Sequence, residues 1–276
     1  MTSRDARAAT PVRDEAAVID DGAVGLTMDG EVATIIVDRV AKLNALTRAM
    51  LERLEEVIRE VGVGDARVVL VRAAPAKAFC VGADINEFAD LSASEIWRDW
   101  TTRGHRVFGA LAGLPQPTVA VLHGHALGGG LELALACDFR VLATGARLGF
   151  PEVGIGTVPG WGGTERLTRL VGPSRAKEII LAGRQLDGET ALAWGVATSV
   201  APDAALDATV ADLVTRILAG APTAIQIAKQ LIDATADGVP SRVIEPLAGA
   251  LTATTADLAE GVAAFRERRN PTFPGR

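Results

Sequence analysis

The chain has 276 residues, 49% hydrophobic and 22% charged, a balance typical of a globular protein with one large or two small domains. A net charge of −6 and the lack of tyrosine argue against a general nucleic-acid binder. Cys80 and Cys137 cannot form a disulfide framework and have no zinc-ligand spacing, so we expect a cytoplasmic location and no metal site. No apolar run reaches membrane-spanning length, so we expect no membrane partner.

The first part of the chain predicts a tail, a hairpin and a helix. Residues 1–22 mix arginine with acidic residues and lack the apolar run of a signal peptide, which predicts a flexible tail. Two β-type runs, 24–28 and 32–37, are joined by Asp29-Gly30, which is a hairpin signal. Residues 47–62 predict a helix because their apolar side chains recur on one face.

The next part alternates strands with helices. A loop at 73–83 precedes two capping-box patterns, at 84–87 and 92–95, and the second opens a helical pattern that extends to about Leu114. Buried strands are expected at 68–71, 118–122 and 139–143. Because strands that alternate with helices form parallel sheets through crossover connections, the sequence predicts an α/β core.

The second half changes character. A glycine-rich loop at 151–163 is followed by segments that nearly all predict helices. These helices are predicted at 164–171, 174–182, 188–194, 204–218, 222–236, 240–254 and 256–269. The chain therefore divides into a core and a helical appendage, which packs either on its own core or on a neighbouring subunit.

The residues most suggestive of chemistry lie between 123 and 134. Three consecutive glycines, 128–130, stand between a predicted strand and a helical pattern, and Glu132 follows two residues later. Glycine permits close approach of the backbone, and the start of a helix presents N–H groups without intrahelical partners. N–H donors beside a carboxylate suit a reaction in which an oxygen gains negative charge and a proton moves. The same pattern also fits a structural corner in which Glu132 only complements the helix dipole.

Two other loops have comparable features, and several alternatives are weaker. Residues 79–84 connect a strand to a helix, and residues 151–156 place Glu152 on a glycine-rich turn. The glycine spacings fit neither a dinucleotide loop nor a Walker A motif, and a G-x-S-x-G elbow is absent from the sequence. The chain's histidines, His105, His123 and His125, lack a carboxylate at ligand spacing, which favours hydrogen bonding over metal binding. Cys80 fits a buried apolar residue better than an activated thiolate.

Several stretches together resemble the crotonase (enoyl-CoA hydratase/isomerase) superfamily, from about Val24 to the C-terminus. The matching stretches are 42–46, 77–85, 123–132, 151–164 and 166–167. The resemblance implies a spiral of repeated ββα units that carries the active site over 23–200. It also implies a C-terminal helical trimerisation region over 201–276, and homotrimers or homohexamers. The implied substrate is an acyl-CoA thioester, as in the β-oxidation of fatty acids.

The resemblance also assigns roles. The main-chain N–H groups of Val81 and Gly129 are expected to form an oxyanion hole around the thioester oxygen. Hydratases of this family carry two glutamates, which match Glu132 and Glu152 here. Two carboxyl groups in one dry pocket acquire unequal pKa values, so one can be neutral while the other is ionised. We hypothesise that Glu152 protonates C2 and that Glu132 activates water, although a coupled pair titrates as a unit.

Substrate contacts are expected from residues beside these groups. Lys42 and Lys77, with Arg268 and Arg269, are candidates for the CoA phosphates, and each also fits a solvated surface charge. The remaining candidates, around the thioester and the acyl chain, are Gly82, Ala83, Asp84, Ile85, Gly128 and Trp161. The acyl pocket is expected along 91–100 and around Trp161, with Trp97, Trp100 and Trp161 either facing the acyl chain or filling the core.

The predicted function is hydration of a 2-enoyl-CoA to a 3-hydroxyacyl-CoA, with no metal or redox cofactor. The alternatives within the family are double-bond isomerisation, retro-aldol cleavage, and hydration of a branched or cyclic enoyl-CoA. A different class of protein, a non-catalytic subunit that binds acyl-CoA or RNA, is also considered.

Overall fold

The computed structural model describes residues 22–275, so the predicted tail at 1–22 lies outside the described residues except for Gly22. The strands are β1 (Ala23–Asp29), β2 (Val32–Asp38), β3 (Val68–Ala73), β4 (Ala78–Cys80), β5 (Thr118–Leu122), β6 (His125–Leu127), β7 (Phe139–Ala143), β8 (Leu148–Gly149) and β9 (Ser199–Ala201). They form a six-stranded sheet in the order β1-β2-β3-β5-β7-β9 and a three-stranded sheet in the order β4-β6-β8. Neighbouring strands are parallel except in the β1–β2 hairpin.

The helices follow the strands in a regular way. The longer helices are α1 (Arg48–Gly62), α4 (Thr102–Ala112), α6 (Gly163–Leu181), α8 (Leu206–Leu218), α9 (Pro222–Ala236), α10 (Ser241–Thr252) and α11 (Ala256–Glu267). The shorter helices are η1 (Val40–Lys42), α2 (Ile85–Ala89), α3 (Ala93–Glu95), the π-helix η2 (Ile96–Thr101), α5 (Gly129–Leu135), η3 (Glu152–Ile155), α7 (Gly188–Ala193) and η4 (Asp203–Ala205).

The core is built from repeated ββα units that follow one another along the chain. Each of the pairs β3–β4, β5–β6 and β7–β8 places its first strand in the large sheet and its second strand in the small one, and helices follow. The predicted α/β spiral of ββα units, with helices dominating the C-terminal region, is therefore confirmed. The hairpin turns at Gly30, whose φ of +56° suits glycine.

The sequence did not predict the strands of the small sheet. Residues 73–83 were expected to be a loop, yet they contain β4, and the glycine corner contains β6. Strands of two or three residues are too short to show an alternating pattern, so only their pairing identifies them. The sheet matters because β4, β6 and β8 are parallel, which brings their carboxyl ends, and the loops that follow, to one edge.

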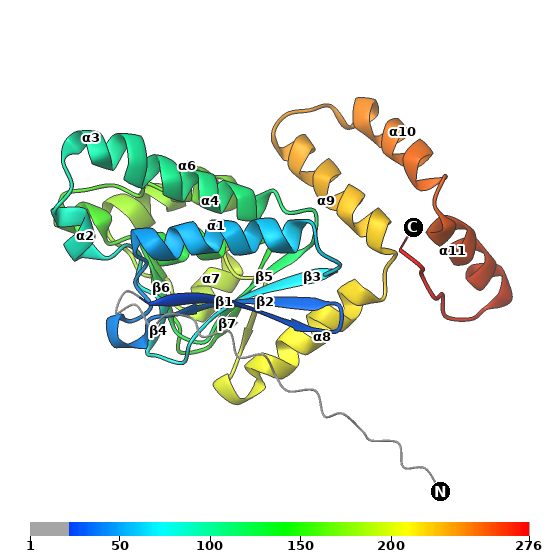
Figure 1. The fold of residues 1–276 in the computed structure, drawn as a ribbon, viewed down its shortest axis with the longest axis horizontal. Coiled ribbons are helices and arrows are strands. Elements are labelled where there is room, and N and C mark those ends of the chain that lie inside the picture. Colours follow the sequence, from blue (N-terminus) through cyan, green and yellow to red (C-terminus); the bar gives the residue numbers. More distant parts are fainter. Residues whose placement is uncertain (1–21, 276) are drawn as a thin grey trace, which may run out of the picture.

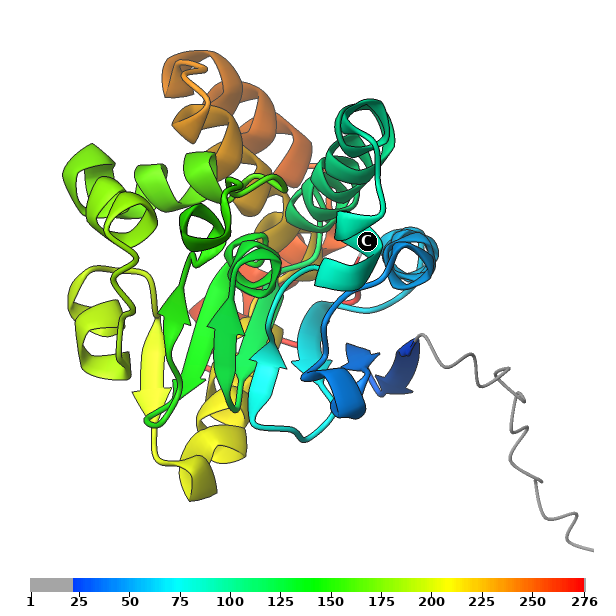
Figure 2. The ribbon, with the colours of Figure 1, turned by 90° about the vertical axis from the view of Figure 1, so that its left-hand side faces the viewer.

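Helices cover both faces of the large sheet. Helices α1 and α4 pack side by side over one face, and α8 lies across the other (Figures 1 and 2). The apolar stripe predicted for residues 47–62 is buried, with Leu51 and Leu54 fully enclosed. On the other face of the large sheet, Leu206, Val210 and Val214 of α8 pack against β3, β5 and β7.

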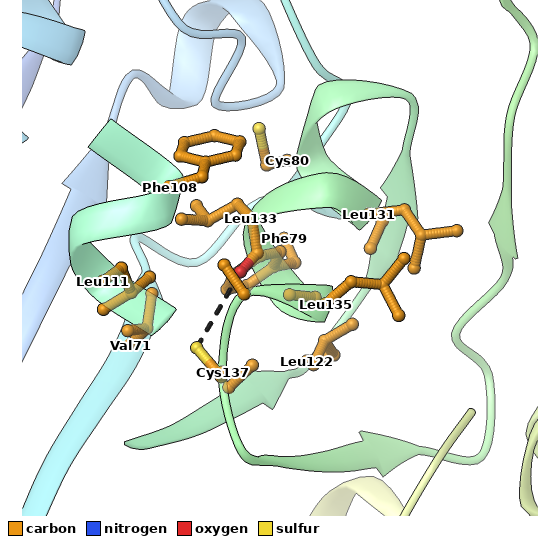
Figure 3. Close-up of a cluster of buried hydrophobic side chains, with 14 of the residues drawn as sticks. Val71, Phe79, Cys80, Phe108, Leu111, Leu122, Leu131, Leu133, Leu135 and Cys137 are labelled. Carbon is orange, nitrogen blue, oxygen red and sulfur yellow. Dashed lines mark hydrogen bonds between the residues drawn. The ribbon is translucent and has the colours of Figure 1, made fainter. Parts of the chain in front are cut away.

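The main core surrounds the short helix α5. Figure 3 shows Leu133 packed among Phe79, Phe108 and Leu111, and the Cys137 thiol donates a 3.8 Å hydrogen bond to the Leu133 carbonyl. Burial raises the pKa of the Cys80 and Cys137 thiols to about 12, although each also feels weaker opposing hydrogen bonds. Both cysteines are therefore protonated apolar residues, as expected for Cys80.

Helices α10 and α11 stand away from the sheets (Figure 1), whereas α9 is held against them by Lys229, which pairs with Asp138 just before β7 at 2.7 Å. The separately predicted helices 164–171 and 174–182 are the two halves of α6, which bends at Gly172, where φ is +75°. Across residues 22–275, no single helix has the length and apolar character to cross a membrane, and the one pair of helices that meets this test together, Asp203–Leu218 and Pro222–Ala236, is bent by 103°.

Candidate active site

Three loops at the carboxyl edge of the small sheet surround a cleft of about 420 Å³. Residues that follow β4, β6 and β8 converge there, which explains how residues as far apart in the sequence as Val81 and Glu152 come to share one site. The predicted site residues that line the cleft are Val81, Gly82, Ala83, Ile85, Gly128, Gly129, Glu132, Glu152 and Trp161.

The main chains of the first two loops approach each other closely. A β-carbon on Gly82 would lie 2.9 Å from the Gly129 nitrogen, and one on Gly130 would lie 2.0 Å from the Cys80 carbonyl oxygen. These positions therefore accept only glycine. Gly129 is the first residue of α5, so its N–H precedes the intrahelical hydrogen bonds, and Val81 follows β4 directly. The two residues predicted to supply an oxyanion hole thus face the same cleft.

Glu132 is buried in α5 and is held by main-chain donors. Its Oε1 accepts hydrogen bonds from the N–H groups of Trp161 at 2.7 Å and Gly163 at 2.8 Å. Gly163 is required at this point because a β-carbon there would lie 2.7 Å from Glu132 Cγ. Burial raises the pKa of the Glu132 carboxyl, and the N–H donors and the charge of Arg166 only partly oppose this.

Glu152, on η3, lines the same cleft, and its carboxyl has fewer hydrogen-bond partners than that of Glu132. Its Oε2 is buried without a hydrogen-bond partner, and its Oε1 lies 2.7 Å from where a β-carbon on Gly128 would be. Burial raises the pKa of Glu152 to about 7, its own main-chain N–H opposes the rise, and the negative charge of Glu132 adds to it. Near neutral pH, Glu152 is therefore divided between its acid and its carboxylate forms.

Aromatic side chains form another wall of the cleft. Trp100 and Trp161 are both buried, with ring centroids 5.5 Å apart, and both line the cavity together with Phe88 and Ile96. Trp100 and Ile96 belong to η2, a π-helix where an α-helix was expected; wide turns of this kind recur at functional sites. In contrast, Trp97 is 70% exposed and is absent from the lining.

Some predicted site residues lie outside the cleft. Asp84 was expected to contact substrate, but it is buried beside the loop, where it caps α2 and pairs with Arg39 at 2.6 Å. Burial alone would raise its pKa, but hydrogen bonds from Arg39 and from the Asn86 N–H outweigh that effect and lower it. Lys42 and Lys77 are exposed on the segments before α1 and β4.

The histidines and the terminal arginines have other surroundings. His123 Nε2 lies 3.1 Å from the Ala76 carbonyl oxygen, and His125 Nδ1 accepts a hydrogen bond from the Arg147 N–H. His105, for which the sequence favoured hydrogen bonding over metal binding, lines the cleft, and no sequence signal placed it there. Arg269 pairs with Glu260 and Glu267. Within residues 22–275, no group of three or more His, Cys, Asp or Glu side chains is arranged to hold a metal ion.

The comparisons with known proteins agree on one family. A sequence model described as enoyl-CoA hydratase/isomerase matches residues 27–276. A short-chain-enoyl-CoA hydratase of Clostridium acetobutylicum is 37% identical over 209 residues, which cover 75% of this chain and 80% of that protein. A human mitochondrial methylglutaconyl-CoA hydratase is 37% identical over 247 residues, covering 87% of this chain and 72% of that protein.

The solved structures give the same answer at the level of the fold. The crystal structure of an enoyl-CoA hydratase from Bacillus anthracis superposes with a TM-score of 0.87 at 34% identity, covering 92% of this chain and 99% of that one. The family match, the spiral of ββα units and the cleft at the edge of its small sheet lead to one conclusion. The chain belongs to the enoyl-CoA hydratase/isomerase family of the crotonase superfamily, whose members act on acyl-CoA substrates.

Proposed function

We propose that this protein hydrates a 2-enoyl-CoA to a 3-hydroxyacyl-CoA. The observation that carries the proposal is the placement of two glutamates, Glu132 from α5 and Glu152 from η3, in one cleft with unequal surroundings. Adding water across a double bond requires one group that accepts a proton and one that donates a proton. A pair of carboxyl groups with separated pKa values can supply both.

The unequal surroundings support a division of roles. Burial raises the pKa of Glu132, but its two main-chain hydrogen bonds stabilise the ionised form, whereas the Glu152 carboxyl has an oxygen without a partner. On that difference we assign Glu132 as the base that takes a proton from water as the oxygen bonds to C3. Glu152 has a pKa of about 7 and an unpaired oxygen, so its protonated form is the acid that donates a proton to C2. One water is consumed in each turnover. Afterwards Glu132 releases its extra proton to solvent, and Glu152 takes up a proton from solvent to regain its acid form.

The main chain supplies the remaining requirement. When water adds to C3, negative charge moves through C2 to the thioester oxygen before C2 is protonated. In our proposal the N–H groups of Val81 and Gly129 donate to that oxygen, because both residues border the cleft beside the glutamates. Donors of this kind are typically worth about 3–4 kcal/mol of transition-state stabilisation each. The proposed chemistry needs no metal or redox cofactor, because carboxyl groups perform both proton transfers.

The lining of the cleft favours an apolar acyl chain. Phe88, Ile96 and Trp100 provide an apolar wall, and no lysine or arginine is among the described residues that line the cavity. The name of the methylglutaconyl-CoA hydratase relatives indicates an acyl chain that carries a second carboxylate. In this chain such a carboxylate would enter a site that already contains two glutamates. Such a charge would be desolvated with His105 as the single basic side chain among the described lining residues, which is costly.

A turnover panel tests this function. The 2,3 double bond conjugated to the thioester absorbs in the ultraviolet, so hydration of crotonyl-CoA removes the band, whereas isomerisation of a 3-enoyl-CoA creates it. We expect rapid loss of the band with crotonyl-CoA and slower turnover with 3-methylglutaconyl-CoA. Retro-aldol cleavage would instead release an aldehyde or a ketone. Tight binding of acyl-CoA without turnover of any substrate would favour the non-catalytic alternative, and RNA binding can be measured in the same preparations.

We also propose that the chain forms homotrimers, alone or paired as hexamers, through the C-terminal helices. Helices α10 and α11 stand off the core and expose large apolar side chains between 41% and 86%. These side chains are Val243, Leu247, Leu251, Leu258, Val262 and Phe265. A neighbouring subunit would cover them. Helix α11 lies far from α2 at the cleft (Figures 1 and 2). Arg268 and Arg269 would therefore contact the phosphates of a CoA bound to a neighbouring subunit. Lys42 and Lys77 would contact those of a CoA bound to their own chain.

A further inference from the structure

The indole of Trp161 lies between two glycines on different helices. A β-carbon on Gly104, inside α4, would lie 2.2 Å from both Cδ1 and Nε1 of Trp161. A β-carbon on Gly129, at the start of α5, would lie 2.5 Å from Cζ3 and 2.7 Å from Cε3 of the same ring. The five-membered ring therefore rests on α4 and the six-membered ring rests on the peptide expected to bind the thioester oxygen.

Other contacts fix the ring in this position. The indole Nε1–H donates a 3.3 Å hydrogen bond to the Trp100 carbonyl oxygen in η2. The Phe108 ring meets the indole edge-on, with centroids 5.4 Å apart and planes at 81°. Trp161 is 3% exposed, so the ring has little room to move. A buried side chain that is held on several sides transmits a displacement to its neighbours because the interior is close-packed.

The main chain of the same residue holds the proposed base. The Trp161 N–H donates to Glu132 Oε1 at 2.7 Å, while the Trp161 carbonyl oxygen accepts a 3.0 Å hydrogen bond from Arg166. One residue thus contacts the base through its backbone and the oxyanion donor through its ring. Gly104 is otherwise unfavourable, because glycine inside a helix is less stable than alanine. The ring of Trp161 explains why this buried helical position lacks a side chain.

We propose that Trp161 is a positioning residue that sets the Gly129 N–H relative to the Glu132 carboxylate, and that Gly104 supplies the space the indole needs. This inference rests on the proposed hydratase function and goes beyond it, since the sequence left Trp161 either facing the acyl chain or filling the core. The alternative is that the ring merely forms a wall for the acyl chain. The two roles differ in what they change: positioning affects kcat and the polarisation of the thioester carbonyl, whereas a wall affects KM and the preferred chain length.

The test is a cycle of Gly104→Ala, Trp161→Ala and the double variant, compared with wild type. Gly109→Ala is the matched control, because Gly109 lies in the same helix and an added β-carbon there has nothing within 4 Å. Each protein is assayed for kcat and KM with crotonyl-CoA. Each is also titrated with a cinnamoyl-CoA that carries a 4-dimethylamino group, whose absorption moves to longer wavelength when hydrogen bonds polarise its carbonyl. Melting temperatures are measured for all five proteins.

We expect Gly104→Ala to lower kcat at least tenfold with a change in KM below threefold, and to reduce the absorption shift of the bound thioester. In the Trp161→Ala background, the same change should alter kcat less than twofold, since the ring it would displace is gone. Gly109→Ala should match wild type. If Gly104→Ala destabilises the fold, Trp161→Ala decides the question, because it removes the ring without adding a β-carbon at Gly104. A wild-type absorption shift and kcat in Trp161→Ala overturn the positioning role.

Other outcomes also decide the question. Equal losses from Gly104→Ala in both backgrounds would show that its effect does not act through the ring, which overturns the coupling. A change confined to KM and chain-length preference would show that the ring is only a wall. If wild type fails to hydrate any enoyl-CoA, the proposed function fails, but the absorption shift still tests the positioning role. A wild-type protein that binds the chromophoric thioester without any shift overturns the inference itself.

Discussion

Glu152 Oε1 lies 2.7 Å from the position that a β-carbon on Gly128 would occupy, so the carboxyl group of one residue fills the space left by the missing side chain of the other. Gly128 also has φ +52° and ψ −128°, a conformation that L-residues avoid. The turn that leads into α5 and the position of the second glutamate are therefore set together.

Gly128→Ala should therefore reduce turnover. The added methyl group would strain the backbone, at a cost of about 1–3 kcal/mol, and would push the Glu152 carboxyl away from the cleft. We expect kcat with crotonyl-CoA to fall about tenfold or more, with a lower melting temperature. Gly154→Ala is the control, because Gly154 lies on the same η3 segment and an added β-carbon meets nothing within 4 Å. Unchanged kcat in Gly128→Ala would contradict the coupling.

The glutamates should be individually essential for turnover. Glu132→Gln and Glu152→Gln keep the side-chain shape but remove the transferable proton, so each should lower kcat by about 10²–10⁴-fold. Binding of acyl-CoA, measured by calorimetry, should remain within a few-fold of wild type. Glu189→Gln, an exposed glutamate on α7, serves as the control. Near-normal hydration by either variant would remove that residue from the mechanism.

The raised pKa of Glu152 should appear in the pH dependence of stability. A carboxyl whose folded pKa is about 7 and whose unfolded pKa is 4.5 binds the proton more tightly in the folded state. Its contribution to stability is full below pH 4.5 and is lost as pH rises through 7. Glu152→Gln should therefore stabilise the protein more at pH 8 than at pH 5, by about 1 kcal/mol after allowance for partial solvent screening. Urea denaturation at the two pH values measures this difference, and equal effects at both would contradict it.

The ion pair between Arg39 and Asp84 should matter for folding rather than for substrate contact. Both side chains are buried, with their charged atoms 2.6 Å apart, so removal of one leaves the other desolvated and unpaired. Asp84→Ala should cost about 3–5 kcal/mol of unfolding free energy, measured with urea. Arg39→Met combined with Asp84→Ala should cost less than the sum of the two single changes. Additive losses would mean that the pair does not act as a unit.

Phe265 tests the proposed trimer. It is 86% exposed on α11, so a charge there leaves the single chain almost undisturbed but prevents burial against a neighbour. Phe265→Asp should shift the mass measured by light scattering from trimer or hexamer toward monomer. Val63→Asp provides a matched control, because Val63 is also 86% exposed but lies at the end of α1 on the core. A wild-type protein that is monomeric throughout would refute the proposal.

The sequence determined the elements whose patterns are local. The Asp29-Gly30 hairpin, the apolar face of α1 and the capping box at Ser92 and Glu95 follow from residues within a few positions of one another, and all are present. The capping-box pattern at 84–87 is only half realised. Asp84 caps α2, but Glu87 accepts a hydrogen bond from the Arg48 N–H on another helix instead. Such competition between local and distant partners cannot be read from spacing.

The residues of the candidate site were also largely predictable, because glycine-rich turns and acidic residues are visible as composition. Their arrangement was decided by the tertiary structure. The parallel pairing of β4, β6 and β8 brings Val81, Gly129 and Glu152 to one edge, and these strands are too short to leave a pattern in the sequence. The tertiary structure also gave two acidic residues different roles. Asp84 forms a structural ion pair with Arg39, whereas burial raises the pKa of Glu152 to about 7. Desolvation depends on every neighbouring segment and not on the residue itself, so the sequence could not distinguish them.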